Sequence, residues 1–247
     1  MKTGKKVKDF KNHVIFNYDG KDYDYAGIFN LIKELKYKKV GFDMDYLVVP
    51  VKDKKTGEDA ICVFFQESNS NKDWFSNLWF FPRSAKAYKG WENRLRFHAG
   101  FYNEYQSGRD EIIKDIKQYV DKGIKRIFAT GWSNGSSTLP IACEDIFFQF
   151  GIRPTFIGYE GAQPCANRWT RDFVQDCFAE DSISFVYGMD IVPRVPPLYP
   201  KFRNIIYYLK VKEKFPILIR KIISIFTKEV YYHSKVDDGI EKYMPKE

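Results

Sequence analysis

The sequence predicts an α/β fold, with a mostly parallel central sheet and helices on both of its faces. Short apolar runs alternate with longer segments whose apolar residues recur at helical spacing, which is the pattern of alternating strands and helices. The chain has 247 residues and is 44% hydrophobic, enough for one sizeable core, and no segment has the composition of a linker. We therefore expect residues 1–247 to form a single domain.

The first half of the chain predicts two consecutive strands, a helix and a third strand. Residues 45–51 and 59–65 are apolar, β-prone runs joined by the turn sequence Lys-Lys-Thr-Gly. Residues 104–121 carry a helical apolar stripe, and Gly123 follows as a helix-terminating glycine would. Residues 125–130 form a short apolar strand that runs directly into Gly131.

The second half of the chain continues this alternation. A helix is expected after Ser133 and up to about residue 150, where Gly151 ends it. Further strands are expected at 155–159, 182–187 and 204–209, and a last helix at 214–226. The recurrence of strand, helix and strand is what makes a parallel sheet the expected arrangement.

The main chemical signal is a G-x-S-x-G pentapeptide between a predicted strand and a predicted helix, Gly131-Trp132-Ser133-Asn134-Gly135. In the α/β-hydrolase fold this spacing forms a tight turn that exposes the serine as a nucleophile. The two glycines are needed because side chains at those positions would collide across the turn. The backbone N–H of Asn134, at the helix N-terminus, is then placed to stabilise an oxyanion.

A serine nucleophile needs a histidine base and a carboxylate, which in this fold follow it in the order acid, then histidine. The chain has three histidines. His13 and His98 precede Ser133, which leaves His233 as the candidate base. The candidate acid is Asp190, because it follows a predicted strand and precedes a proline-stiffened loop. Rival carboxylates fall on a predicted helix and its following loop, namely Asp172, Asp176 and Asp181.

Four segments resemble the fungal-type, or class 3, lipase family, in that family's order, and cover roughly residues 45 to 235. The most specific is V-Y-G-M-D-I-V-P-R-V-P-P at 186–197, which is similar to the acid-bearing D-I-V-P-x-L-P-P segment. The others lie at 63–78, which includes F-F-Q-E-S and D-W, at 98–101, which reads H-A-G-F, and at 156–167, which includes G-A-Q-P.

The resemblance implies a serine esterase or lipase that acts on lipid acyl esters through a triad of Ser133, Asp190 and His233. It also implies that the backbone N–H of Ser68 joins that of Asn134 in the oxyanion hole, and that His98 is structural. The family's pattern requires no cofactor and no metal ion, and the sequence contains no cluster of Cys and His with metal-ligand spacing.

The composition limits the partners and the location. The net charge of +8 favours an anionic partner, which could be an anionic membrane surface. No nucleic acid is expected, because no recognition motif accompanies the charge. No signal peptide is visible, so a cytoplasmic protein, in peripheral contact with a membrane, is expected. A disulfide between Cys165 and Cys177 is an alternative to four free thiols.

Two apolar segments bear on the substrate, and each has two interpretations. Residues 79–91 are aromatic and basic, and form either a mobile lid that docks on lipid or a packed loop over the sheet. Residues 214–228 form either an interfacial helix or a helix that faces the core. Both favour an apolar acyl substrate over a sugar or a peptide. The resemblance implies an enzyme like a triacylglycerol lipase or a phospholipase A1.

The alternative hypothesis is a catalytically weak or inactive hydrolase-fold module that binds lipid or a protein partner. It is motivated by departures from the family pattern. Gln66-Glu67 stands where the family has Arg-Gly before the oxyanion residue, and a carboxylate there would oppose the developing charge. Asn134 replaces an apolar residue, and Pro140 falls early in the predicted helix.

Overall fold

The computed structural model of the chain describes residues 13–41, 44–66, 82–84, 95–187, 190, 192–203 and 205–209. Four residues and segments singled out above lie outside these ranges: Glu67, Ser68, His233 and the segment 214–228. Most of the segment 79–91 also lies outside them. Among the helices that are described, none is both long enough and apolar enough to cross a bilayer.

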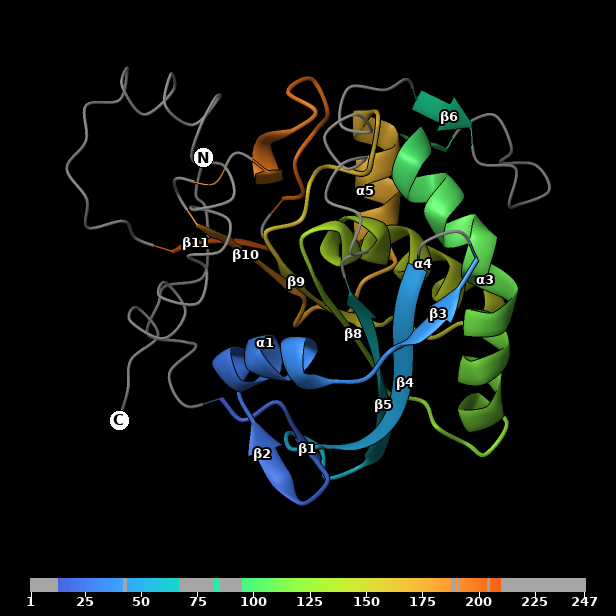
Figure 1. Cartoon of the computed structure of the whole chain (residues 1–247), viewed down its shortest axis with the longest axis vertical. Helices are drawn as coiled ribbons and strands as arrows, with labels where there is room; N and C mark the ends of the chain where they lie inside the picture. Colours follow the sequence, from blue (N-terminus) through green and yellow to red (C-terminus); the bar gives the residue numbers. More distant parts are fainter. Residues whose placement is uncertain are drawn as a thin grey trace.

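Nine of the described strands form one sheet, in the order β11-β10-β9-β8-β5-β4-β1-β2, with β3 on β4 (Figure 1). The strands are β1 Phe16–Tyr18, β2 Lys21–Tyr23, β3 Lys38–Val40, β4 Met44–Asp53, β5 Asp59–Gln66, β8 Ile127–Trp132, β9 Thr155–Tyr159, β10 Ile183–Tyr187 and β11 Ile206–Leu209. Two shorter strands pair separately, β6 Pro82–Ser84 and β7 Arg96–His98.

The centre of the sheet is parallel. Strand β8 pairs in parallel with β5 and β9, and β10 pairs in parallel with β9 and β11. β4, β1 and β2 extend the sheet in antiparallel fashion. Parallel strands end at the same edge of a sheet, so the residues that follow β5, β8, β9 and β10 emerge at one edge, which we call the carboxyl edge.

Helices cover both faces, as predicted. The helices are α1 Tyr25–Glu34, α3 Ala99–Val120, α4 Asn134–Phe150 and α5 Arg168–Asp176. Two separate apolar clusters fill the spaces on either side of the sheet, one with α1 and the other with α3, α4 and α5. Because α4 packs against the sheet and also against α3 and α5, nearly its whole surface is buried over residues 134–146.

One buried charge on α4 is compensated from α3. Asp145 accepts two hydrogen bonds from Arg109, at 2.6 and 2.9 Å, and a third from the hydroxyl of Tyr105 at 2.8 Å. A buried carboxylate is tolerated only with such partners, since an unpaired charge in the interior is very costly. This contact fixes α3 against α4, which carries the pentapeptide.

The predicted architecture is confirmed, with differences at the ends of elements. The helix expected at 104–121 begins earlier, at Ala99, because the His98 side chain caps it by accepting a hydrogen bond from the Gly100 N–H. The strand expected at 125–130 is shifted to Ile127–Trp132. The N-terminal elements from β1 to β3 were not predicted, because three strands of three residues each are too short to show periodicity.

All four cysteines are free and buried, so the Cys165–Cys177 disulfide is not formed. Burial raises the pKa of the thiols of Cys62, Cys143 and Cys165 well above the ordinary value. Burial also raises the pKa of Cys177 to about 12. Thiols held in this protonated state are poor nucleophiles.

Candidate active site

The turn between β8 and α4 places Ser133 at the carboxyl edge of the sheet. The residue has φ 55° and ψ −117°, a combination that residues other than glycine rarely adopt. The surrounding backbone holds it there: its N–H donates to the Tyr159 carbonyl at 2.9 Å, and its carbonyl accepts from the Ser137 N–H at 3.0 Å. Strain of this kind persists only where the surroundings impose it, and it is concentrated at functional sites.

The Ser133 hydroxyl is fully buried, and no described residue offers its Oγ a hydrogen bond. The neighbouring Ser137 differs, because its Oγ donates to the Ser133 carbonyl at 2.9 Å and accepts from the Ala162 N–H at 2.7 Å. Ser137 therefore braces the turn. Ser133 keeps its hydroxyl available for a partner.

The two glycines of the pentapeptide allow close backbone contacts. A Cβ on Gly131 would lie 2.8 Å from the carbonyl carbon of Gly135 and 3.0 Å from the Phe65 oxygen. A Cβ on Gly135 would lie 2.5 Å from the Phe65 oxygen. The glycine spacing thus brings the turn against the last residues of β5, from which the chain continues to Ser68.

Replacing Gly135 by alanine is expected to destabilise the fold strongly. The new Cβ would meet backbone atoms of Phe65, which cannot rotate away as a side chain can. We expect chemical denaturation to show a loss of about 3 kcal/mol or more in the free energy of unfolding. Gly20→Ala is the matched control. Its φ is +77° but a Cβ there meets nothing within 4 Å, so only the left-handed backbone cost of about 1 kcal/mol is expected. Equal losses in the two variants would contradict the close approach at Gly135.

Asn134 is the first residue of α4, so its backbone N–H lies among those that lack a partner within the helix. Its side chain is anchored to α3, because Nδ2 donates to both oxygens of Glu104, at 2.8 and 2.9 Å. Glu104 was not predicted as part of the site. Its position at the start of the predicted helix 104–121 contained no signal for this contact, which depends on how α3 packs against α4.

Asp190 follows β10 at the same edge and is buried. Its Oδ1 accepts the Val192 N–H at 2.9 Å. The loop that follows is tied to the segment after β9, because Gln163 donates its side-chain amide to the Pro193 carbonyl at 2.6 Å and its backbone N–H to the Val195 carbonyl at 2.8 Å. These contacts hold the carboxylate two strands from Ser133, with β9 between them.

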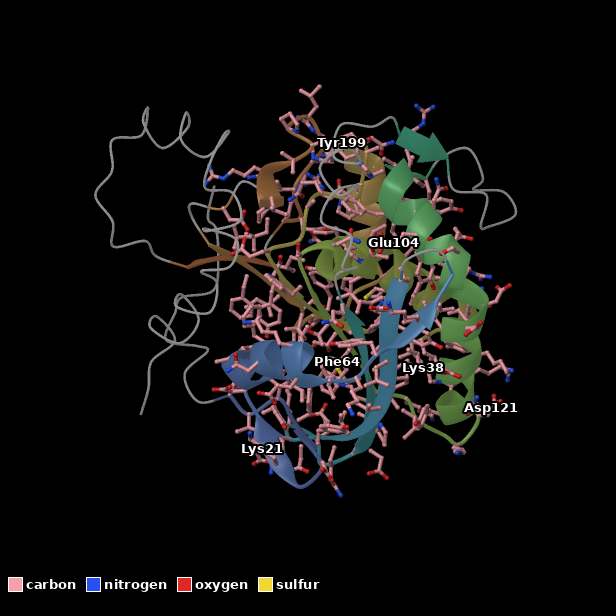
Figure 2. All side chains as sticks on the ribbon, viewed as in Figure 1. Lys21, Lys38, Phe64, Glu104, Asp121 and Tyr199 are labelled. Carbon is pink, nitrogen blue, oxygen red and sulfur yellow. The ribbon has the colours of Figure 1, made fainter. Side chains whose placement is uncertain are left out.

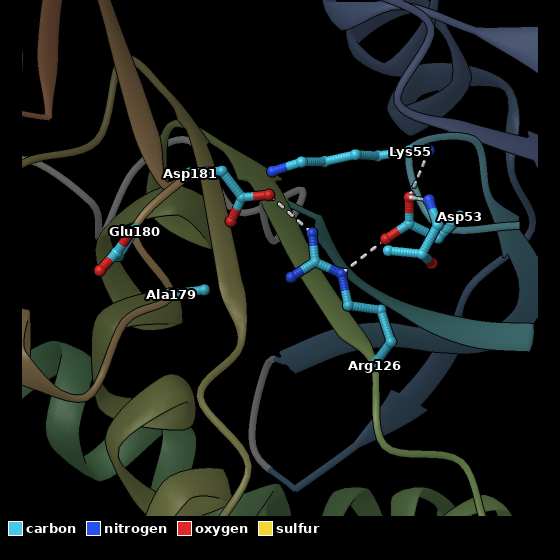
Figure 3. A pocket seen from close by; sticks show the side chains of 7 residues that line it. Asp53, Lys55, Arg126, Ala179, Glu180 and Asp181 are labelled. Carbon is cyan, nitrogen blue, oxygen red and sulfur yellow. Dashed lines mark hydrogen bonds and ion pairs between the residues drawn. The ribbon is translucent and has the colours of Figure 1, made fainter. Parts of the chain in front are cut away.

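The rival carboxylate Asp181 lies at the opposite edge of the sheet, before β10 rather than after it. It accepts from Arg126 at 2.6 Å and from the Thr155 hydroxyl at 2.7 Å, and Arg126 also pairs with the buried Asp53 at 2.8 Å (Figure 3). These hydrogen bonds and the Arg126 charge outweigh partial burial and lower the pKa of Asp181. Asp53, Arg126 and Asp181 border a surface pocket of about 340 Å³, which is remote from the carboxyl edge. The other two rivals, Asp172 and Asp176, lie on α5, as predicted.

Glu160 is a further buried carboxylate at the carboxyl edge that sequence analysis missed. It directly follows β9, between the strands that lead to Ser133 and Asp190, and its N–H donates to the Phe185 carbonyl at 3.0 Å. Its φ of 52° is unusual for a glutamate. The adjacent Gly161 is the residue at which sequence alone would place a left-handed conformation.

His98 is buried at the start of α3, and its bonding conflicts with the role of a base. Its Nδ1 accepts the Gly100 N–H at 3.2 Å, so in the neutral imidazole the proton lies on Nε2. A triad histidine needs the other tautomer, with Nδ1–H facing the acid and Nε2 facing the serine. The ring packs against Phe101, with ring centroids 4.5 Å apart.

The site therefore brings Ser133, Asn134 and Asp190 to one edge of the sheet, with Gly131 and Gly135 shaping the turn. Ser68 and His233 lie outside the described residues, so their places in the site remain predictions, as do the catalytic roles of the whole set. Among the described residues, no three His, Cys, Asp or Glu side chains are grouped as metal ligands would be.

Comparison with known proteins agrees with this architecture. Residues 62–199, more than half of the chain, match the family described as Lipase (class 3). No curated protein matches the sequence. Among solved structures, the Rhizomucor miehei triacylglyceride lipase is similar with a TM-score of 0.59 at 17% identity, covering 80% of this chain and 78% of that one.

A second similar structure is a triacylglycerol lipase described as having a catalytic centre formed by a serine protease triad. It has a TM-score of 0.59 at 18% identity, and the match covers 82% of this chain and 81% of that one. Other relatives are matched over less of their length. The chain spans 61% of one fungal lipase and 55% of the Rhizomucor miehei lipase in a propeptide complex. At these identities, the structural likeness establishes the fold.

Proposed function

Because the chain belongs to the class 3 lipase family, we propose that it is a serine carboxylester hydrolase that cleaves acyl esters of lipids. The observation that carries the proposal is the strained Ser133 at the turn from β8 to α4, whose buried hydroxyl is not bonded by any residue that the structure describes. The described residues therefore leave this hydroxyl open to a base, as the nucleophile of a serine hydrolase requires. Asp190 at the same edge supplies a carboxylate in the chain order that the fold requires.

In the proposed mechanism, Ser133 Oγ attacks the ester carbonyl while His233 accepts the hydroxyl proton. The resulting tetrahedral oxyanion accepts hydrogen bonds from the backbone N–H groups of Asn134 and Ser68. The intermediate then collapses, and His233 returns the proton to the departing alcohol. Water, activated by the same histidine, hydrolyses the acyl-enzyme and restores Ser133.

Asp190 would hold His233 in the required tautomer and stabilise the imidazolium that forms. The support for this role is the rigidity of the Asp190 loop. One carboxylate oxygen is engaged by the Val192 N–H, and the loop is braced by Gln163. A carboxylate held in this way keeps its orientation through both proton transfers.

The proposed substrate is an acyl lipid, either a triacylglycerol or a phospholipid cleaved in the manner of a phospholipase A1. Family membership supports the ester-hydrolase chemistry. The aromatic segment 79–91 and the apolar segment 214–228 support an apolar acyl substrate over a sugar or a peptide. No cofactor is required, because the serine, the histidine and the oxyanion donors complete the chemistry.

A second candidate, a weak or inactive hydrolase-fold module, is favoured by one contact at the site. The Glu104 carboxylate binds the side chain of Asn134, the same residue whose N–H is assigned to the oxyanion. The negative charge of Glu104, next to Asn134, opposes the development of negative charge on the substrate oxygen. Glu104 is partly exposed, so water screens this effect.

Labelling with a fluorophosphonate probe tests the proposal against this alternative. We expect the purified wild-type chain to be labelled covalently, and mass spectrometry of the digest to place the phosphonate on Ser133. Such probes react only with an activated serine, so other serines of the chain serve as internal controls. A folded protein that stays unlabelled, both with and without detergent, would support the inactive module.

A further inference from the structure

The loop that follows Asp190 presents an exposed leucine on a stiff turn. Leu198 is 92% exposed, whereas the most exposed of the other large described hydrophobic residues reaches 41%. The Tyr199 N–H donates to the Pro196 carbonyl at 3.0 Å, which closes a turn with Leu198 near its tip. Prolines at 196, 197 and 200 restrict φ on both sides of the leucine. We call residues 194–201 the Leu198 tip.

The Leu198 tip is held at the carboxyl edge of the sheet. Its base is bonded to Gln163 through Pro193 and Val195, and the ring of Tyr199 lies 6.1 Å from that of His98. The tip projects at the same end of the molecule as the candidate active site (Figure 1), and Tyr199 marks its position in Figure 2. The turn therefore has a fixed orientation relative to Ser133 and Asp190.

The Leu198 tip is also basic. Arg194 and Lys201 flank the leucine, and both side chains are accessible to solvent over part of their surface. Partial burial, followed by the nearby charge of Arg194, lowers the pKa of Lys201. Of the described carboxylates nearby, Asp190 is buried at the base of the loop, and Asp172 pairs with Arg171 at 2.7 Å. Two solvent-accessible cations this close together give the tip a positive charge, which attracts an anionic surface.

We propose that the Leu198 tip docks on an anionic membrane surface, with Leu198 inserted at the headgroup boundary and Arg194 and Lys201 against lipid phosphates. Docking through this tip turns the carboxyl edge of the sheet toward the bilayer, from which the ester substrate is taken. That second part rests on the proposed function; the docking itself does not.

The shape of the tip favours a membrane over a protein partner. A stable protein interface buries about 800 Å² on each side around a core rich in aromatic residues. The Leu198 tip offers one fully exposed apolar side chain on a narrow turn, rimmed by cations. An apolar side chain that enters about 5–10 Å into the headgroup region, with basic residues at the surface, is the arrangement of interfacial anchors.

Vesicle co-sedimentation of the full chain tests the proposal, with Ser133→Ala as the background so that the lipid is not hydrolysed. The vesicles are phosphatidylcholine, with and without phosphatidylserine. We expect preferential binding to the vesicles that contain phosphatidylserine. Leu198→Ser should weaken that binding about tenfold. The pair Arg194→Gln and Lys201→Gln should weaken it by about 25-fold, at about fivefold for each charge.

The matched control is the pair Lys21→Gln and Lys122→Gln, which removes the same charge far from the tip. Lys21 and Asp121, the neighbour of Lys122, lie at the opposite end of the molecule from Tyr199 (Figure 2). Because surface charges act over about 10 Å, this pair should change binding less than twofold. Thermal unfolding of each variant at the wild-type temperature shows that the fold is retained.

Three results would overturn the docking proposal. They are equal binding to both kinds of vesicle, unchanged binding by Leu198→Ser, and an equal loss in the control pair. If the fluorophosphonate probe labels Ser133 of the wild type but the protein does not bind vesicles, the docking proposal is rejected and the proposed hydrolase function is retained. If the protein binds vesicles but is not labelled by the probe, the proposed hydrolase function is rejected and the docking proposal is retained.

Discussion

Replacing Ser133 by alanine is expected to reduce ester turnover on the order of a million-fold, because the covalent step has no other nucleophile. The residual rate comes from substrate binding and the oxyanion donors alone. The fold should be unaffected. No described residue bonds to the Ser133 hydroxyl, so its removal leaves no partner unsatisfied. Steady-state hydrolysis of a soluble ester and thermal unfolding of the same preparation measure the two effects.

Ser182→Ala gives the converse control. The Ser182 hydroxyl accepts the Phe156 N–H at 3.0 Å at the start of β10, away from the carboxyl edge. Its loss should lower the free energy of unfolding by about 1–3 kcal/mol, since a buried backbone donor is left unpaired, without changing kcat. Full turnover in Ser133→Ala would reject the assignment of the nucleophile.

Replacing His233 by alanine is expected to cause a loss of turnover as large as that of Ser133→Ala, because nucleophile and base act as one unit. The double variant should therefore be no slower than either single variant. This non-additivity separates a base from a residue that merely stabilises the fold. Initial rates of the two single variants and the double variant complete the test.

The other two histidines of the chain are natural controls for His233. His13 is exposed and remote from the site in sequence, so His13→Ala should retain turnover. His98→Ala should lower stability, because the ring caps α3 and packs against Phe101. Normal turnover in His233→Ala would show that the base lies elsewhere. If the double variant of Ser133→Ala and His98→Ala were no slower than either single variant, the base would be His98.

The parts of the site that sequence analysis could place are those set by local constraints. The pentapeptide needed glycines at 131 and 135 because the β5 backbone lies within van der Waals range, and that requirement is visible as spacing. Asp190 could be chosen over Asp181 because position before or after a strand decides which edge of the sheet a residue reaches. The first inference follows from residue spacing, and the second follows from chain order.

The parts that could not be placed depend on packing between distant segments. Glu104 meets Asn134 across thirty residues of chain, and only the contact of α3 with α4 brings them together. Glu160 holds a left-handed backbone conformation next to a glycine that would have accommodated it more readily. The helix α1 covers one face of the sheet from a segment that has no distinctive motif. Hydrophobic pattern reports which residues are buried, but not which partner buries them.

The four buried cysteines give this chain a built-in reporter of its own integrity. Each thiol is free, enclosed and held protonated by burial, so a thiol-reactive dye in solution finds no target while the chain is folded. The amount of dye that reacts is then a measure of the number of unfolded molecules, because each unfolded chain exposes four thiols. For any variant at the assay temperature, the number of labelled thiols distinguishes a folded but inactive protein from an unfolded one.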